Sequence, residues 1–165
     1  MSDFRVGLGV DAHALADDVP LVLGGIAIDH PRGLVGHSDG DVLAHALVDA
    51  LLGAVNQGDI GTLFPSDDPA LEGISSLDLL SRAYERVTGL GYELVNADCV
   101  LIGEEPRIQD LREQMSRALA AELGVDAAVL AVSATTTDRL GFTGRGDGLA
   151  AQAVVLLRRA SAPPA

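Results

Sequence analysis

The chain has 165 residues, of which 24 are acidic and 11 basic, and a formal net charge of −13. All eleven basic residues are arginines, because the sequence contains no lysine. This absence excludes Schiff-base catalysis by lysine and the P-loop of nucleoside triphosphatases. The acidic surplus argues against binding to nucleic acid or to anionic membrane surfaces.

The composition predicts one domain with an aliphatic core. The length suits a single domain over residues 1–159, with the stretch 160–165 as a frayed tail. Apolar residues form 48% of the chain and aromatic ones only 3%, so the core must consist mainly of Ala, Val, Leu and Ile. The single cysteine, Cys99, lies in an apolar run, which favours a buried, inert thiol over a nucleophile. The chain shows neither a secretory-signal pattern nor an apolar run of the ~20 residues that span a membrane, so we expect a cytoplasmic protein.

Hydrophobic periodicity and turn residues predict the secondary structure. In chain order we expect a strand at 4–11, a strand at 21–28 broken by two glycines, a helix at 39–55 and an exposed loop at 65–73. There follow a helix at 76–88 with Ser75 or Ser76 as its N-cap, a strand at 93–102, a helix at 106–123, a strand at 127–135, a helical turn at 137–142 and a strand at 149–157. Pro106 near the start of the third helix and Gly124 after its end match the usual asymmetry of helix termini.

The order of these elements favours an α+β domain over a repeated βαβ arrangement, because the first two strands are adjacent in sequence. We expect a mixed β-sheet covered by helices on one face. The last strand carries apolar residues at both parities, which is typical of a strand buried on both faces. In a domain of this size, such burial favours an oligomer packed sheet against sheet.

Candidate metal ligands first occur at the end of the first predicted strand, in Gly7-Leu8-Gly9-Val10-Asp11-Ala12-His13. A dinucleotide-binding fingerprint is rejected here, because the third glycine is missing and no helix pattern follows. Asp11 and His13 project to the same side of an extended chain, where a carboxylate and an imidazole can converge on one ion. Asp-x-His is common by itself, so an ordinary strand end remains the alternative.

A second polar group, residues 37–45, runs from a turn into the first predicted helix with the sequence His-Ser-Asp-Gly-Asp-Val-Leu-Ala-His. His45 has Asp41 and Asp49 one helical turn away on either side, which suits a metal ligand whose other nitrogen is oriented by an acid. The alternative is a solvated helix face capped by Asp39. Together with the Asp-x-His pair, this histidine offers two nitrogens and one oxygen and leaves a fourth tetrahedral position open, as in catalytic zinc sites.

Two further segments carry polar candidates beside glycines. Asp59, in Gly-Asp-Ile-Gly, could bind substrate hydroxyls or act only as a turn residue. Three threonines at 135–137 offer hydroxyls and N–H groups as an anion site that needs no lysine. Asp138 after them could hold a hard cation such as Mg²⁺, and Arg145 between two glycines could meet an anionic group. A Thr-capped loop is the alternative for this segment.

Four motifs follow one another along essentially the whole chain: Gly-x-Gly-x-Asp-x-His, His-Ser-Asp-Gly-Asp-x-x-x-His, Gly-Asp-Ile-Gly-x-x-Phe-Pro and Ala-Thr-Thr-Thr-x-x-Leu-Gly-Phe-Thr-Gly-Arg. In this combination the chain closely resembles the 2-C-methyl-D-erythritol 2,4-cyclodiphosphate synthase family of non-mevalonate isoprenoid biosynthesis. Each motif alone is unspecific, but their combination is highly specific. The resemblance implies a homotrimer whose sheets pack around a central axis, with active sites between neighbouring subunits.

The reaction that the resemblance implies is an intramolecular phosphoryl transfer by a cyclising lyase. The 2-phosphate of 4-diphosphocytidyl-2-C-methyl-D-erythritol 2-phosphate attacks the β-phosphorus, which forms a cyclic diphosphate and releases CMP. By resemblance, Asp11, His13 and His45 bind one Zn²⁺ per subunit, and Asp138 binds Mg²⁺ or Mn²⁺. Such a reaction needs charge neutralisation and positioning more than a protein nucleophile.

The resemblance also implies which residues bind the substrate. They are Asp11, His13, His37, Ser38, Asp59, Ile60, Gly61, Gly103, Glu104, Glu105, Pro106, Arg107, Ile108, Thr135, Thr136, Thr137, Asp138, Phe142 and Arg145. The residues expected to act in catalysis are His37, Asp59, Thr136 and Asp138. Residues 103–108 would cradle cytosine, largely through backbone groups. Family members can also carry an isoprenoid diphosphate in the axial channel, near Phe142 and Arg145.

Three positions depart from the family pattern. Asp138 and Asp147 stand where the family usually has Glu, and Ser133 stands where Lys is frequent. The shorter Asp138 would bring the second metal closer to the backbone or bind it through water. Two other functions are compatible with the sequence: a metal-dependent phosphohydrolase, which would release inorganic phosphate, and a trimeric binding protein without activity. The intact set of metal-ligating side chains counts against the binding protein.

Overall fold

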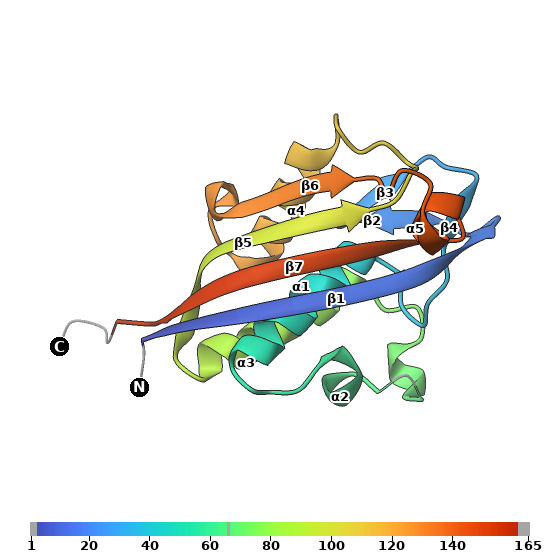
Figure 1. The fold of residues 1–165 in the computed structure, drawn as a ribbon. Helices are drawn as coiled ribbons and strands as arrows, with labels where there is room; N and C mark the ends of the chain where they lie inside the picture. Colours follow the sequence, from blue (N-terminus) through green and yellow to red (C-terminus); the bar gives the residue numbers. More distant parts are fainter. Residues whose placement is uncertain (1–2, 66, 162–165) are drawn as a thin grey trace.

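The structure, a computed structural model, describes residues 3–65 and 67–161. Within these residues the main feature is a five-stranded sheet of order β4-β1-β7-β5-β6 (Figure 1). Its strands are β1 (Phe4–Asp17), β4 (Arg32–Leu34), β5 (Tyr92–Ile102), β6 (Leu130–Thr135) and β7 (Gly148–Arg159). The α-helices are α1 (Val42–Ala54), α2 (Ile60–Leu63), α3 (Ser76–Gly89), α4 (Arg112–Leu123) and α5 (Gly141–Arg145). The remaining elements are the short strands β2 (Leu21–Leu23) and β3 (Ile26–Ile28) and the 3-10 turns η1 (Pro69–Leu71) and η2 (Ala127–Val129).

The predicted mixed sheet is confirmed. β1 and β7 run antiparallel, with Phe4 opposite Arg158 at one end of the pair. β5 pairs antiparallel with β7 but parallel with β6. Because neighbouring parallel strands end at the same edge, the carboxyl ends of β5 and β6 lie side by side (Figure 1).

Helices α1, α3 and α4 lie on one face of the sheet, so this expectation is also confirmed (Figure 1). α1 packs on β1 and β7 and is buried on nearly all sides. Two glycines of β1 permit this contact. A Cβ atom at Gly7 would lie 1.8 Å from the carbonyl oxygen of Ala50, and one at Gly9 would lie 1.8 Å from that of Ala46. The Gly-x-Gly pair therefore serves close packing between a helix and a strand.

The opposite face of the sheet, which we call the open face, exposes apolar side chains in the single chain. Phe4, Val6, Leu8 and Val10 of β1 are 54%, 69%, 63% and 54% exposed, and Val154 of β7 is 45% exposed. The predicted burial of the last strand on both faces depends on packing against a second copy and stays a prediction, since one chain leaves this face of the strand partly exposed. A contiguous apolar surface of this kind is typical of an interaction site.

The N-terminal segments differ from the prediction in their turns. The stretch 21–28 is a hairpin of β2 and β3, not one strand, because Gly24 and Gly25 adopt left-handed backbone angles and reverse the chain. β1 continues from the predicted end at residue 11 to Asp17, where it pairs with β4. β4 and α2 were not predicted, because three or four residues are too few to show a periodic pattern.

The C-terminal half differs mainly in where its helices begin. α4 begins at Arg112 and not near Pro106, which follows a cis peptide bond. Ile108 and Leu111 continue the apolar spacing of the helix into the preceding loop, which explains the overlong prediction. Gly124 ends α4 in a left-handed conformation, as expected. The predicted strand at 127–135 starts with η2, and the helical turn predicted at 137–142 forms later, as α5.

Two predicted segments contain residues outside those described. Residue 66 belongs to the predicted loop 65–73, whose other residues are exposed or half-buried and include η1. Residues 162–165 belong to the predicted tail, which stays a prediction. Among the described helices, none has the length and apolar character that crossing a membrane requires.

Candidate active site

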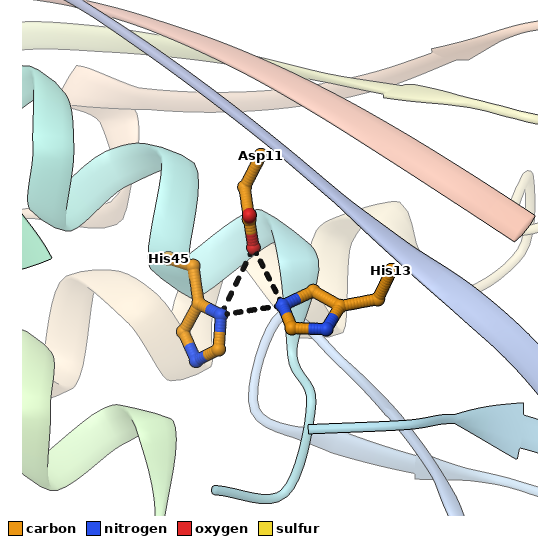
Figure 2. Close-up of side chains that lie close together, drawn as sticks. All are labelled: Asp11, His13 and His45. Atoms are coloured by element: carbon orange, nitrogen blue, oxygen red, sulfur yellow. Dashed lines mark hydrogen bonds and ion pairs between the residues drawn. The ribbon is translucent and has the colours of Figure 1, made fainter. Parts of the chain in front are cut away.

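Asp11, His13 and His45 converge on one point between β1 and α1 (Figure 2). Oδ2 of Asp11 lies 2.9 Å from Nε2 of His13 and 3.0 Å from Nδ1 of His45, and the two nitrogens are 3.1 Å apart. Nε2 of His13 and Nδ1 of His45 face each other, and only one of them can donate a hydrogen to the other. The other nitrogen therefore points a lone pair toward the three side chains. Ligand atoms at ~2.0–2.1 Å from a tetrahedral zinc ion would stand about 3.3 Å apart. The donor set therefore fits zinc after outward movements of a few tenths of an ångström.

The period of β1 brings its two ligands to the helix ligand. Gly7, Gly9, Asp11 and His13 alternate along an extended strand, so all four face α1. The glycines let α1 approach the strand, and His45 on the buried side of α1 then reaches Asp11, which follows the glycines on the same side of β1. The same sequence feature thus builds both the helix contact and the ligand group.

Each histidine has its second ring nitrogen held by a hydrogen bond. Nδ1 of His13 donates to the carbonyl oxygen of Val35 at 2.6 Å. Nε2 of His45 lies 2.8 Å from Oγ of Ser76 and 2.9 Å from Oγ of Ser38. Partners of this kind orient a ligating imidazole. Sequence reasoning considered Ser76 only as a helix cap and missed this contact, because the contact joins α3 to α1 across the fold.

The prediction that Asp41 or Asp49 orients His45 is wrong. Asp41 is fully buried and caps α1, and its carboxylate also accepts hydrogen bonds from the N–H groups of Gly24 and Gly25. Burial raises the pKa of Asp41, against the effect of these hydrogen bonds. Asp49 accepts a hydrogen bond of 2.7 Å from the N–H group of the first residue of α2. Both acids therefore hold neighbouring segments against α1.

The electrostatics of the ligand group follow from its pairing. Burial by itself raises the pKa of Asp11, but its close pairing with His13 and His45 outweighs burial and holds that pKa well below its ordinary value. The hydrogen bond to Asp11 raises the pKa of His13, against the effect of burial. A divalent ion must displace the proton from Nε2 of His13, so metal binding competes with protonation.

A cavity of about 480 Å³ opens beside the three ligands, and we call it the metal-side cavity. Of the predicted site residues it is lined by Asp11, His13, His37, Ser38, His45, Ile60 and Gly61. Its other wall comes from residues between Phe64 and Ile74, which the sequence predicted mainly as an exposed loop and not as part of a site. Asp59 does not line this cavity. Its carboxylate caps α2 and accepts hydrogen bonds from the N–H and hydroxyl groups of Thr62 at 2.8 and 2.7 Å.

A second cavity, of about 310 Å³, lies where the carboxyl ends of β5 and β6 meet, and we call it the loop cavity. Of the predicted site residues it is lined by Gly103, Glu104, Pro106, Arg107, Ile108, Thr135 and Thr136. The N–H group of Gly103 donates to the carbonyl oxygen of Thr135 at 3.0 Å, and that of Arg139 donates to Glu104 at 3.1 Å. Among the described residues, Glu105 lines neither cavity, and none lines both. In one chain, the predicted site is therefore divided into two parts.

The remaining predicted residues follow the loop cavity along the chain. Asp138 has a left-handed backbone (φ 50°) and accepts a hydrogen bond of 3.4 Å from Oγ1 of Thr136. Thr137 donates its hydroxyl to a backbone carbonyl of the same turn. Phe142 is 44% exposed on α5, and Arg145 is paired with a neighbouring carboxylate. Within the described part of the chain, Asp138 joins no group of three metal-ligating side chains.

Comparison with known proteins places these features in a family. The sequence profile of the YgbB family matches residues 4–158. The chain belongs to the YgbB family. It is 56% identical over 163 residues to a 2-C-methyl-D-erythritol 2,4-cyclodiphosphate synthase of Rubrobacter xylanophilus, which covers 97% of this chain and 98% of that protein. The resemblance to the cyclodiphosphate synthases is therefore confirmed.

Solved structures share the fold as well. The bifunctional IspDF of Campylobacter jejuni superimposes with a TM-score of 0.92 at 40% identity, over 96% of this chain and 43% of that chain. A CDP complex of IspF from Plasmodium falciparum superimposes with a TM-score of 0.85 at 29% identity, over 98% of this chain and 99% of that chain. The YgbB chain thus corresponds to nearly all of the second protein and to less than half of the first.

Proposed function

We propose that this YgbB-family chain is a cyclising, CMP-releasing lyase that makes 2-C-methyl-D-erythritol 2,4-cyclodiphosphate. An oxygen of the 2-phosphate attacks the β-phosphorus of 4-diphosphocytidyl-2-C-methyl-D-erythritol 2-phosphate. The bond from the β-phosphorus to the bridging oxygen breaks, and CMP leaves with that oxygen. The observation that carries the proposal is the convergence of Asp11, His13 and His45 beside a cavity, in a chain 56% identical to a named synthase.

The metal-side cavity would hold the reacting phosphates. We assign one zinc ion to the two histidines and Asp11, and an ion bound there would polarise the β-phosphate and offset the charge that develops on it. His37 and Ser38 on the same wall would contact phosphate oxygens. The segment from Asp59 to Gly61 would meet the methylerythritol hydroxyls. The attacking phosphate is already ionised, so these residues position it and need not remove a proton.

The loop cavity would hold the cytidine end of the substrate. A CDP complex of a structural neighbour supports a cytidine diphosphate-linked substrate. Residues 103–108 would surround cytosine, and the hydroxyls of Thr135, Thr136 and Thr137 would contact the phosphates. Asp138 would hold Mg²⁺ or Mn²⁺, which would offset the charge of the phosphates, since carboxylate oxygens are the ligands that such hard cations prefer.

A homotrimer with active sites between subunits is part of the proposal. The division of the site supports the homotrimer, because the proposed zinc ligands line the metal-side cavity of one chain, whereas most of residues 103–108 line the loop cavity. A neighbouring copy would supply the missing part. The apolar open face supports packing of the sheets around an axis. In such a trimer, Phe142 and Arg145 would offer an apolar ring and a cation to an isoprenoid diphosphate in the axial channel.

Product analysis tests the proposal most directly. The purified protein, with the cytidyl substrate and Mg²⁺, should release CMP and the cyclic diphosphate in equal amounts and no inorganic phosphate. Release of inorganic phosphate would instead indicate a phosphohydrolase, and absence of turnover would overturn both enzymatic functions.

A pair of histidine variants tests the metal assignment. His45→Ala should lose bound zinc and CMP release while the oligomer persists. His30→Ala is the matched control, because within the described part of the chain the His30 ring forms hydrogen bonds only with the backbone of Arg32, and it should keep zinc and activity. Turnover at the wild-type rate by the His45 variant would contradict the assignment.

A further inference from the structure

Ser76 lies behind His45, on the side away from the other two ligands, and is fully buried. Its hydroxyl is 2.8 Å from Nε2 of His45 and 3.2 Å from Oγ of Ser38, and it donates to Oδ1 of Asp39. The helix α3 does not need this hydroxyl as a cap, because Oγ of Ser75 accepts the hydrogen bond from the second residue of the helix. The Ser76 hydroxyl is therefore available to bind the imidazole of His45.

The direction of these hydrogen bonds can be derived from the Asp39 carboxylate. It faces three donors: the hydroxyl and the N–H group of Ser76, and the N–H group of Asp41. A serine hydroxyl has one hydrogen, and an ionised carboxylate can only accept. The hydrogen of Ser76 therefore points at Asp39, which leaves the oxygen of Ser76 to accept a hydrogen bond from Nε2 of His45. Nε2 of His45 thus carries the hydrogen, and Nδ1 presents its lone pair to the cluster.

We propose that Ser76 and Asp39 are positioning residues that hold His45 in the tautomer and ring orientation that bind the metal. This inference rests on the zinc site of the proposed function. The chain of hydrogen bonds runs from the imidazole through the hydroxyl to a carboxylate, an arrangement that fixes the tautomer and the ring orientation of a metal-ligating histidine. Neither residue belongs to the set that the family resemblance implied.

Ser38 contacts the same nitrogen, at 2.9 Å, but its surroundings differ. It lines the metal-side cavity and accepts a hydrogen bond from the N–H group of Gly40. Ser76 has no exposed surface and has the Asp39 carboxylate behind it. The structure therefore separates a serine that faces the substrate cavity from one that acts only through the ligand.

Zinc affinity, measured by competition with a chromogenic chelator, tests the inference without relying on activity. Ser76→Ala should weaken zinc binding about 10- to 100-fold, the usual effect of removing a partner of a metal ligand. It should also change the d–d absorption of the Co²⁺-substituted protein, because the ring of His45 loses one of its two serine partners. Ser76→Thr keeps the hydroxyl and should restore both properties.

Ser75→Ala is the matched control, because it removes the cap of α3 and leaves the contact with His45 intact. It should lower the unfolding temperature but keep wild-type zinc affinity and the wild-type Co²⁺ spectrum. Loss of zinc affinity in both serine variants would show that helix stability, and not positioning, is responsible. That result would overturn the inference.

Asp39→Asn keeps the shape of the side chain and decides the matter where Ser76→Ala does not fold. It should weaken zinc binding several-fold, because the hydrogen-bond chain then ends on a neutral group. Wild-type affinity in this variant, or in a folded Ser76→Ala, would refute the inference while the zinc site stands. A wild-type protein that binds no zinc would refute the proposed metal site itself.

Discussion

Gly9→Ala is expected to damage the metal site from a distance, through the packing of α1 on β1. The added Cβ atom would lie 1.8 Å from the carbonyl oxygen of Ala46, against 3.4 Å or more in ordinary contacts, and 2.6 Å from the backbone nitrogen of Ala50. Both neighbours are backbone atoms of a buried helix and cannot rotate away. The helix must therefore move outward by about 1.6 Å, if the strand stays in place.

The size of this movement decides what is lost. His45 is the residue before Ala46, so it moves with the helix and leaves Asp11 and His13 on the strand. Metal–ligand distances tolerate only about 0.2 Å, and the expected shift is several times larger. Overpacking of a buried contact also costs about 1–3 kcal/mol of folding free energy. We therefore expect both weaker zinc binding and lower stability.

Gly53→Ala is the matched control for this experiment. Gly53 lies on the same helix, but a Cβ atom there would meet nothing within 4 Å. Alanine should stabilise the helix by up to about 1 kcal/mol and leave the zinc content unchanged. Zinc content by elemental analysis and thermal unfolding at one fixed protein concentration would measure both effects. Wild-type zinc content and stability in Gly9→Ala would refute the packing argument.

The remaining predictions concern reactivity, pH, assembly and charge. Burial raises the pKa of the Cys99 thiol to about 12, so Ellman's reagent should react with it only after unfolding, and fast reaction of the native protein would contradict its burial. In the metal-free protein, folding raises the pKa of His13 and lowers that of Asp11, so the pair should stabilise the fold most between pH 3.8 and 6.5, the ordinary pKa values of the two groups. This stabilisation should be lost as pH rises through the pKa of His13 in the folded protein, or falls through that of Asp11. The urea midpoint of unfolding should therefore depend less on pH in the His13→Gln variant than in the wild type. Leu8→Arg, on the open face, should give a folded monomer by light scattering and circular dichroism, without CMP release; an intact oligomer would argue against packing through this face. Asp138→Asn should bind CDP more weakly than the wild type in the presence of Mg²⁺ but more tightly in EDTA. Each difference should be about fivefold if one charge contact is worth about 1 kcal/mol. Calorimetry that shows no such reversal would contradict the role of Asp138 as a metal ligand.

The sequence predicted the three side chains of the candidate metal site, because two of them follow from a local rule. Asp11 and His13 share one side of a strand whatever the rest of the fold does. Placing His45 beside them required more than its helical position. The glycines at 7 and 9 fix which strand the helix contacts and how closely, and their meaning became clear only when the helix was seen against them.

The partners of these ligands could not be predicted from local patterns. Asp41 and Asp49 stand at the helical spacing that suggests contact with His45, yet their carboxylates bind backbone N–H groups of other segments. The residue that does contact His45 is Ser76, which lies 31 positions away and looks in the sequence like part of a helix cap. A buried N–H group left without an acceptor costs free energy. The two acids satisfy such groups instead of contacting His45, and helical spacing alone does not reveal this.

The absence of lysine has a physical consequence for how such a site can work. Phosphates must be met by N–H groups, threonine hydroxyls, arginines and bound cations, in a chain with a net charge of −13. Of the acids at the proposed site, Asp11 is held ionised by its histidines, and Asp138 is exposed beside the threonines. Both would repel a polyanion until a cation binds them. In the proposed site, a bound metal would therefore govern whether the substrate binds as well as how fast it reacts.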